Sequence, residues 1–92
     1  MSNKLIFRKH ALQRMFQRSI STNDVRVVLD DGKCIMAYPD DTPYPSRLML
    51  GWRGDRPIHV VAADTQENET IVITVYEPDP ELWEEGFERK KP

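Results

Sequence analysis

The spacing of apolar residues changes at Gly32, and this change constrains the fold of the chain more than any other feature. Before Gly32, apolar side chains recur every three or four residues, which predicts helices at about 8–18 and from about 21 to Gly32. Ser21, followed three residues later by Asp24, is a capping pattern for the second helix, and Gly32 is a typical stop. After Gly32 the spacing becomes two, which is typical of strands.

Four strands are predicted in the second part of the chain, at 33–38, 46–53, 57–64 and 70–76. If Thr65 pairs with Thr70, the last two strands place His59 opposite Tyr76. A short amphipathic helix is predicted at 81–87. The expected fold class is therefore α+β: two N-terminal helices packed on a four-stranded antiparallel sheet, with a short C-terminal helix and a partly open second sheet face.

Length and composition indicate a single domain over residues 1–92. The single Cys34 excludes a disulfide within the chain and fits a reducing compartment. The longest apolar run, Val60–Ala63, is too short for a membrane span or the core of a signal peptide. We therefore expect a cytoplasmic protein that makes no contact with a membrane.

Charge is distributed unevenly along the chain, although the formal net charge is only -2. The first twenty residues contain no acid, and their cations are Lys4, Arg8, Lys9, Arg14 and Arg18. Acidic residues gather later, above all from 77 to 88. This asymmetry favours a localised anionic ligand or an acidic partner over a general coat for nucleic acid.

One stripe of the first predicted helix combines an imidazole with two guanidiniums. His10, Arg14 and Arg18 are spaced by four residues and therefore share a helix face. We expect a different face to be buried, with the residues Ala11, Leu12, Met15 and Phe16. An imidazole beside guanidiniums offers a titratable group and donors that suit phosphate. The alternative is an ordinary solvated helix face.

Cleavage of an RNA phosphodiester needs two proton transfers and neutralisation of the phosphate charge. His10 and His59 are the candidates for proton transfer, which requires that both open onto one cleft. The other candidates are Arg14 and Arg56 for the transition-state phosphate, Arg18 and Arg47 for flanking phosphates, and Tyr76 to orient His59 or contact the substrate. No cofactor and no metal ion are expected, because the sequence contains no glycine-rich phosphate loop and no pattern of metal ligands.

Each of these candidates also has a structural interpretation. His59 lies between Ile58 and Val60, where a histidine commonly serves the packing of a strand. Arg56 can hold a neighbouring carboxylate, and Tyr76 can be a partly buried sheet tyrosine.

Four stretches of the chain resemble the bacterial family catalogued as domain of unknown function 4258, over about Phe7 to Arg89. They are 10–18, 38–47, 51–61 and 73–83, and they contain the patterns His-x-x-x-Arg-x-x-x-Arg, Arg-Pro-x-His-Val and Thr-x-Tyr-x-Pro-Asp-x-x-x-Trp. That family is similar to RelE-type toxins. The resemblance implies a RelE-like fold and a type II toxin that cleaves mRNA as a metal-independent endoribonuclease. It also implies a cognate antitoxin, of a zinc-finger type with a helix-turn-helix. The competing interpretation is a non-catalytic binding module of the same fold that docks an acidic protein partner.

Overall fold

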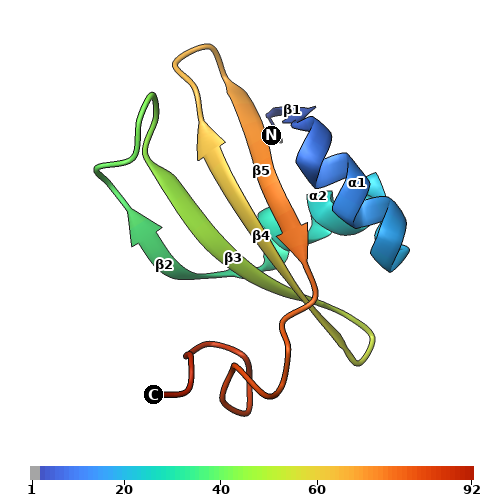
Figure 1. The fold of residues 1–92 in the computed structure, drawn as a ribbon. Helices are drawn as coiled ribbons and strands as arrows, with labels where there is room; N and C mark the ends of the chain where they lie inside the picture. The colour runs from blue at the N-terminus through green and yellow to red at the C-terminus, as the bar shows by residue number, and fades with distance from the viewer. Residues whose placement is uncertain (1–2) are drawn as a thin grey trace.

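The structure is a computed structural model and describes residues 3–92, which form two helices and five strands (Figure 1). In chain order these are β1 (Lys4–Phe7), α1 (Lys9–Arg18), α2 (Thr22–Asp31), β2 (Lys33–Tyr38), β3 (Ser46–Arg53), β4 (Arg56–Asp64) and β5 (Glu69–Tyr76). Neither helix is long and apolar enough to cross a membrane.

The sheet has five strands in the order β1-β5-β4-β3-β2. Strand β1 runs parallel to β5, and the other neighbouring strands pair antiparallel. The expected four-stranded antiparallel sheet with a C-terminal helix is therefore wrong, although the class is still α+β. The four residues of β1 are too few to show a periodicity, and they become a strand because β5, more than sixty residues later, offers an edge.

The predicted helix at 81–87 is absent, and this segment forms turns and one isolated bridge, between Trp83 and Lys90. Gly86 and Phe87 have φ angles of 91° and 61°, which lie in the left-handed region and cannot continue a right-handed helix. Pro78 and Pro80 precede the segment, and each removes a backbone donor.

The two N-terminal helices begin and end close to the predicted positions. The Ser21 hydroxyl accepts a hydrogen bond from the Asp24 N–H at 3.0 Å, and the Asp24 carboxylate accepts one from the Ser21 N–H at 2.9 Å. This reciprocal pair satisfies two backbone groups at the start of α2. At the other end, the Gly32 N–H donates to the Val28 carbonyl.

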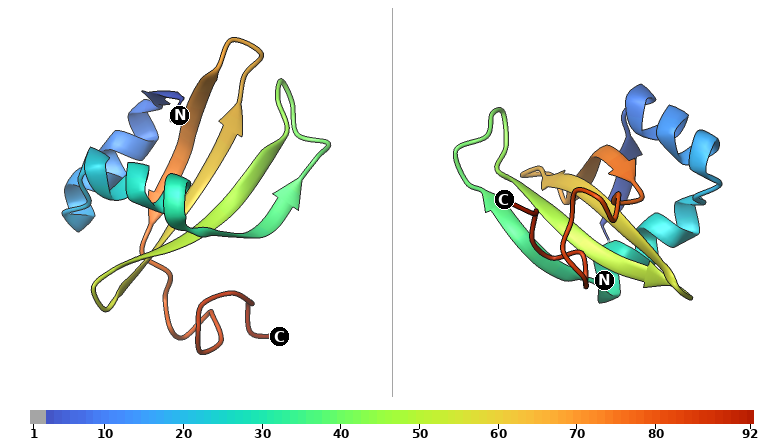
Figure 2. Two further views of the ribbon diagram at one scale, coloured as in Figure 1. Left: turned by 180° about the vertical axis from the view of Figure 1, so that it is seen from behind. Right: turned by 60° about the horizontal axis from the view of Figure 1, so that its bottom comes forward.

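Both helices cover the same face of the sheet, α1 over β5 and α2 over β3 and β4 (Figure 2). The core lies between these layers and includes Ala11, Val25, Val28, Val60 and Val72. Helix α2 approaches the sheet closely at Gly51, where an added Cβ would lie 2.6 Å from the Val28 Cγ2 atom. The predicted covering of one sheet face by two helices is therefore confirmed.

Helix α1 buries a narrower side than the sequence predicts. Ala11 and Met15 are buried, whereas Leu12 is 47% and Phe16 is 89% exposed. The expectation that Leu12 and Phe16 enter the core is wrong, because α1 lies over β5, next to the short edge strand β1, and no element of residues 3–92 covers its outer side.

Residues 77–92, which we call the C-terminal segment, lie at one end of the sheet (Figure 2) and cover the opposite face there, around Trp52 and His59. Trp83 is only 5% exposed and packs its ring edge-to-face on His59, and Phe87 packs in the same manner on Trp52. The second face of the sheet, which the sequence predicts to be partly open, is therefore open only where this segment does not cover it.

Candidate functional site

His59 is fully buried on the sheet face that the C-terminal segment covers. Its neighbours in β4, Ile58 and Val60, point into the core under the helices, so the side chain of His59 points to the opposite side. Both ring nitrogens have partners: Nδ1 lies 3.2 Å from the Tyr76 hydroxyl, and Nε2 lies 2.9 Å from the Phe87 carbonyl oxygen.

These partners assign the tautomer of His59. The Phe87 carbonyl only accepts, so Nε2 carries the proton, and the neutral Nδ1 accepts from the Tyr76 hydroxyl. Burial lowers the pKa of His59 below its ordinary value, an effect that the hydrogen bond to Phe87 partly opposes. The imidazole is thus a neutral, fully bonded side chain, which matches its structural interpretation.

Tyr76 lies directly opposite His59 in the sheet, as the sequence predicts. The register predicted for this hairpin is right at this end and shifts by one residue between Val61 and Ala62. Burial raises the pKa of the Tyr76 phenol above its ordinary value, with a smaller contribution from Tyr38. The phenol therefore remains a neutral hydrogen-bond partner of His59 at physiological pH.

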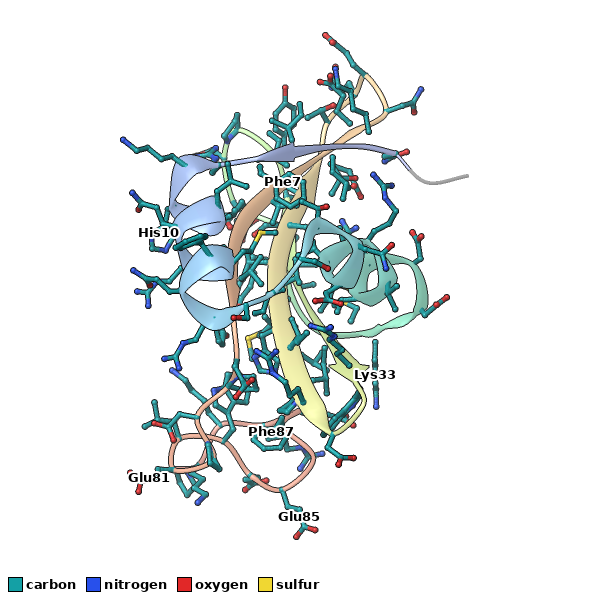
Figure 3. All side chains as sticks on the ribbon, turned by 90° about the vertical axis from the view of Figure 1, so that its right-hand side faces the viewer. Phe7, His10, Lys33, Glu81, Glu85 and Phe87 are labelled. Atoms are coloured by element: carbon teal, nitrogen blue, oxygen red, sulfur yellow. The ribbon has the colours of Figure 1, made fainter. Side chains whose placement is uncertain are left out.

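The structure does not bring His10 and His59 together. His10 is exposed on α1, on the helix side of the sheet, whereas His59 is enclosed on the other side. Figure 3 shows His10 on the outer surface of α1, well separated from Phe87 in the segment that covers His59. A mechanism in which these two imidazoles share one proton-transfer step has no geometric basis in this arrangement.

Arg56 joins three elements rather than facing an open site. Its Nε donates to the Glu77 carboxylate at 2.7 Å, and its Nη2 donates to the Arg18 carbonyl oxygen at 2.7 Å. The guanidinium is thereby neutralised by an acid and satisfies a carbonyl at the end of α1. These contacts match the interpretation of Arg56 as a holder of a carboxylate.

Arg47 is also engaged by an acid. It lies in β3 and forms an ion pair with Asp64 of β4 at 2.7 Å. Asp64 in turn accepts a hydrogen bond from the Thr70 hydroxyl at 2.7 Å. This network links three neighbouring strands, and it places Arg47 away from the exposed surface of α1.

One set of the predicted site residues does remain together, on a surface that we call the cationic flank (His10, Arg14 and Arg18). All three side chains are exposed, and successive members are about 6 Å apart along the helix axis. Neither Arg14 nor Arg18 forms an ion pair with any described carboxylate. These charges are therefore available to an anionic ligand.

The other exposed side of α1 carries Leu12 and Phe16, which we call the apolar flank. It borders a shallow groove that Lys9, Gln13 and Gln17 complete. The exposure of this surface does not follow from the sequence, because the spacing of Leu12 and Phe16 is equally typical of buried residues. The aromatic cover of His59 does not follow from the sequence either, because no local pattern pairs Trp83 or Phe87 with strand residues more than twenty positions earlier.

Metal ligation has no support among residues 3–92. No three side chains of the types His, Cys, Asp and Glu come together there in a way that would hold an ion.

A protein-family model described as Domain of unknown function (DUF4258) matches residues 7–77. The searches of curated proteins and of solved structures give no match.

Proposed function

The chain belongs to the family described as Domain of unknown function (DUF4258), and from this premise and the geometry of α1 we propose that it is a toxin-type endoribonuclease. One observation carries the proposal: His10, Arg14 and Arg18 form an exposed flank with no ion-pair partner among residues 3–92. RNA presents a row of phosphates, and unpaired cations in a row are the complementary chemistry. In this proposal the chain resembles RelE-type toxins in activity, and a cognate antitoxin neutralises it.

In the proposed reaction, each residue of the cationic flank has its own role. His10 takes the proton of a ribose 2′-hydroxyl, and the 2′-oxygen attacks the adjacent phosphorus. Arg14 neutralises the charge of the phosphorane, and Arg18 holds a flanking phosphate. The bond from phosphorus to the 5′-oxygen then breaks, and the leaving oxygen takes the proton back from the imidazolium. The products are a 2′,3′-cyclic phosphate and a 5′-hydroxyl end, and no metal ion takes part.

The test combines growth arrest with cleavage of labelled RNA by the purified chain. We expect the wild type to arrest a bacterial host and to cleave RNA in the presence of EDTA. Arg14→Ala should lower the cleavage rate by about 10²–10³, because one donor to the developing charge is lost. His10→Ala should lower it by about 10²–10⁴.

Arg89→Ala is the matched control, since Arg89 is an exposed cation outside α1. It should cleave at the wild-type rate. A wild type that leaves RNA intact, or a His10→Ala variant that cleaves normally, would rule out the enzyme.

A second function, a non-catalytic module that docks an acidic partner, is favoured by a different observation. His59 has both ring nitrogens bonded and is fully buried, so His10 is the one accessible imidazole of the chain. For such a module we expect intact RNA, no growth arrest in any variant, and partner binding that weakens as salt rises.

A further inference from the structure

We propose that the apolar flank of α1 binds an acidic, amphipathic helical segment of another protein. The proposal does not depend on RNA cleavage, because it concerns Leu12 and Phe16 rather than the cationic flank. It identifies the surface and the chemistry of a partner whether or not the chain is an enzyme.

The apolar flank exposes two large hydrophobic side chains on one side of α1. Phe16 is 89% exposed and Leu12 is 47% exposed, and the two are four residues apart. Large apolar side chains at this spacing are typical anchors by which one helix binds another. Lys9, Gln13 and Gln17 lie beside them and complete a shallow, open hollow on the surface of α1.

The charges around the flank select an acidic partner. Each charged residue from Lys4 to Arg18 is a cation. Lys9 lies in the first turn of α1, where no acid is present, and a cation there opposes the helix dipole. Carboxylates of a bound partner would relieve this repulsion and pair with Lys9, which borders the apolar flank.

The same charges argue against two other occupants. A second copy of the chain would bring two cationic α1 helices together, which is unfavourable. The chain's own acidic C-terminal segment lies on the far face of the sheet, where Trp83 packs on His59 and Glu88 pairs with Lys33 at 2.7 Å. It therefore leaves the apolar flank uncovered.

A membrane surface is less suited to this flank than a protein segment. The inward side of α1, with Ala11 and Met15, is already buried in the core. Only two large apolar side chains of the helix remain exposed, and interfacial helices bury a continuous apolar face.

The full-length chain is used as the target for selecting binders from a displayed library of random 16-residue peptides. We expect enriched peptides to carry net negative charge and apolar residues at helical spacing. Phe16→Ser should weaken their binding by at least tenfold, without lowering the denaturation midpoint of the chain, since Phe16 is almost fully exposed. Leu82→Ser is the control, because Leu82 is 57% exposed but lies in the C-terminal segment. It should bind as the wild type does.

Three outcomes would overturn the proposal: no enrichment, enriched peptides that are neutral or basic, or equal binding to Phe16→Ser. Sedimentation with vesicles of anionic phospholipid provides a further arm. If the vesicles, and no acidic peptide, bind the wild type and not Phe16→Ser, the flank is a membrane surface instead. Failure of the RNA proposal is distinguishable, because Phe16→Ser should retain cleavage whereas His10→Ala should retain peptide binding.

Discussion

His59 illustrates how a residue with catalytic chemistry can serve the fold. Its imidazole bridges two parts of the molecule, the hydroxyl of Tyr76 in β5 and the carbonyl of Phe87 in the C-terminal segment. Because the ring of His59 is buried, each of these hydrogen bonds also satisfies a polar group that would otherwise lack a partner. The side chain therefore holds the C-terminal segment on the sheet.

Because burial lowers the pKa of His59, the folded state favours the neutral ring. The unfolded state then binds more protons between the two pKa values, and stability falls as the pH drops from the ordinary histidine pKa to the lowered one. We expect His59→Phe to lower the free energy of unfolding by about 1–3 kcal/mol at neutral pH. The difference from the wild type should shrink as the pH falls from about 7.5 to about 5.

Urea denaturation at several pH values measures this difference. His10→Gln is the matched control, because it replaces the exposed histidine and leaves the hydrogen bonds of His59 in place. A His59→Phe variant whose deficit stays constant over this range would contradict the assignment of a neutral, bonded imidazole.

Among the elements, the C-terminal segment has little regular structure and is nonetheless held firmly. The contacts that hold it are the aromatic packing of Trp83 and Phe87 and the ion pair of Glu88. It lacks the regular backbone hydrogen bonds of a helix. The backbone contributes as well, since the Lys91 N–H donates to the Leu82 carbonyl at 2.9 Å.

We expect Trp83→Ala to lower the free energy of unfolding by about 3–5 kcal/mol, because it removes a large buried side chain from the ring of His59. Leu82→Ala, at an exposed neighbour, should change it by less than about 0.5 kcal/mol. Denaturation followed by circular dichroism compares the two. An equal effect of both substitutions would mean that the segment does not pack on the sheet.

At the scale of the whole molecule, β1 closes the sheet at the edge of β5. The pairing joins Lys4 to Glu69 and Phe7 to Val72, and the Arg8 N–H extends it to the Val72 carbonyl at 3.1 Å. Phe7 is also packed against the core. The N-terminal end of the chain therefore covers an edge that would otherwise be open to other strands.

Deleting residues 3–7 should lower the free energy of unfolding by at least about 3 kcal/mol, through lost ladder hydrogen bonds and the lost burial of Phe7. The exposed edge of β5 should also promote aggregation. Lys4→Ala removes a charge of the same strand and should behave as the wild type. Denaturation curves and light scattering measure both effects, and a deletion variant as stable as Lys4→Ala would show that β1 contributes nothing.

The sequence by itself determined the elements whose signals are local. The capping pair of Ser21 and Asp24, the stop at Gly32 and the change to a spacing of two depend on neighbouring residues only. The pairing of His59 with Tyr76 agrees with the prediction because a bulge between Val61 and Ala62 compensates for the turn, where Thr70 pairs with Asp64 and not with Thr65. The cationic flank is a further local result, since its spacing needs only a helix.

The tertiary structure decided everything that depends on distant partners. Strand β1 exists because β5 accepts it, and the C-terminal segment stays irregular because its aromatic side chains reach the sheet. The tertiary structure also decided the burial of Phe16 and His59: the apolar side chain of Phe16 is exposed, and the polar side chain of His59 is enclosed. Whether a side chain is buried depends on which distant elements pack over it, and the local spacing of residues does not carry this information.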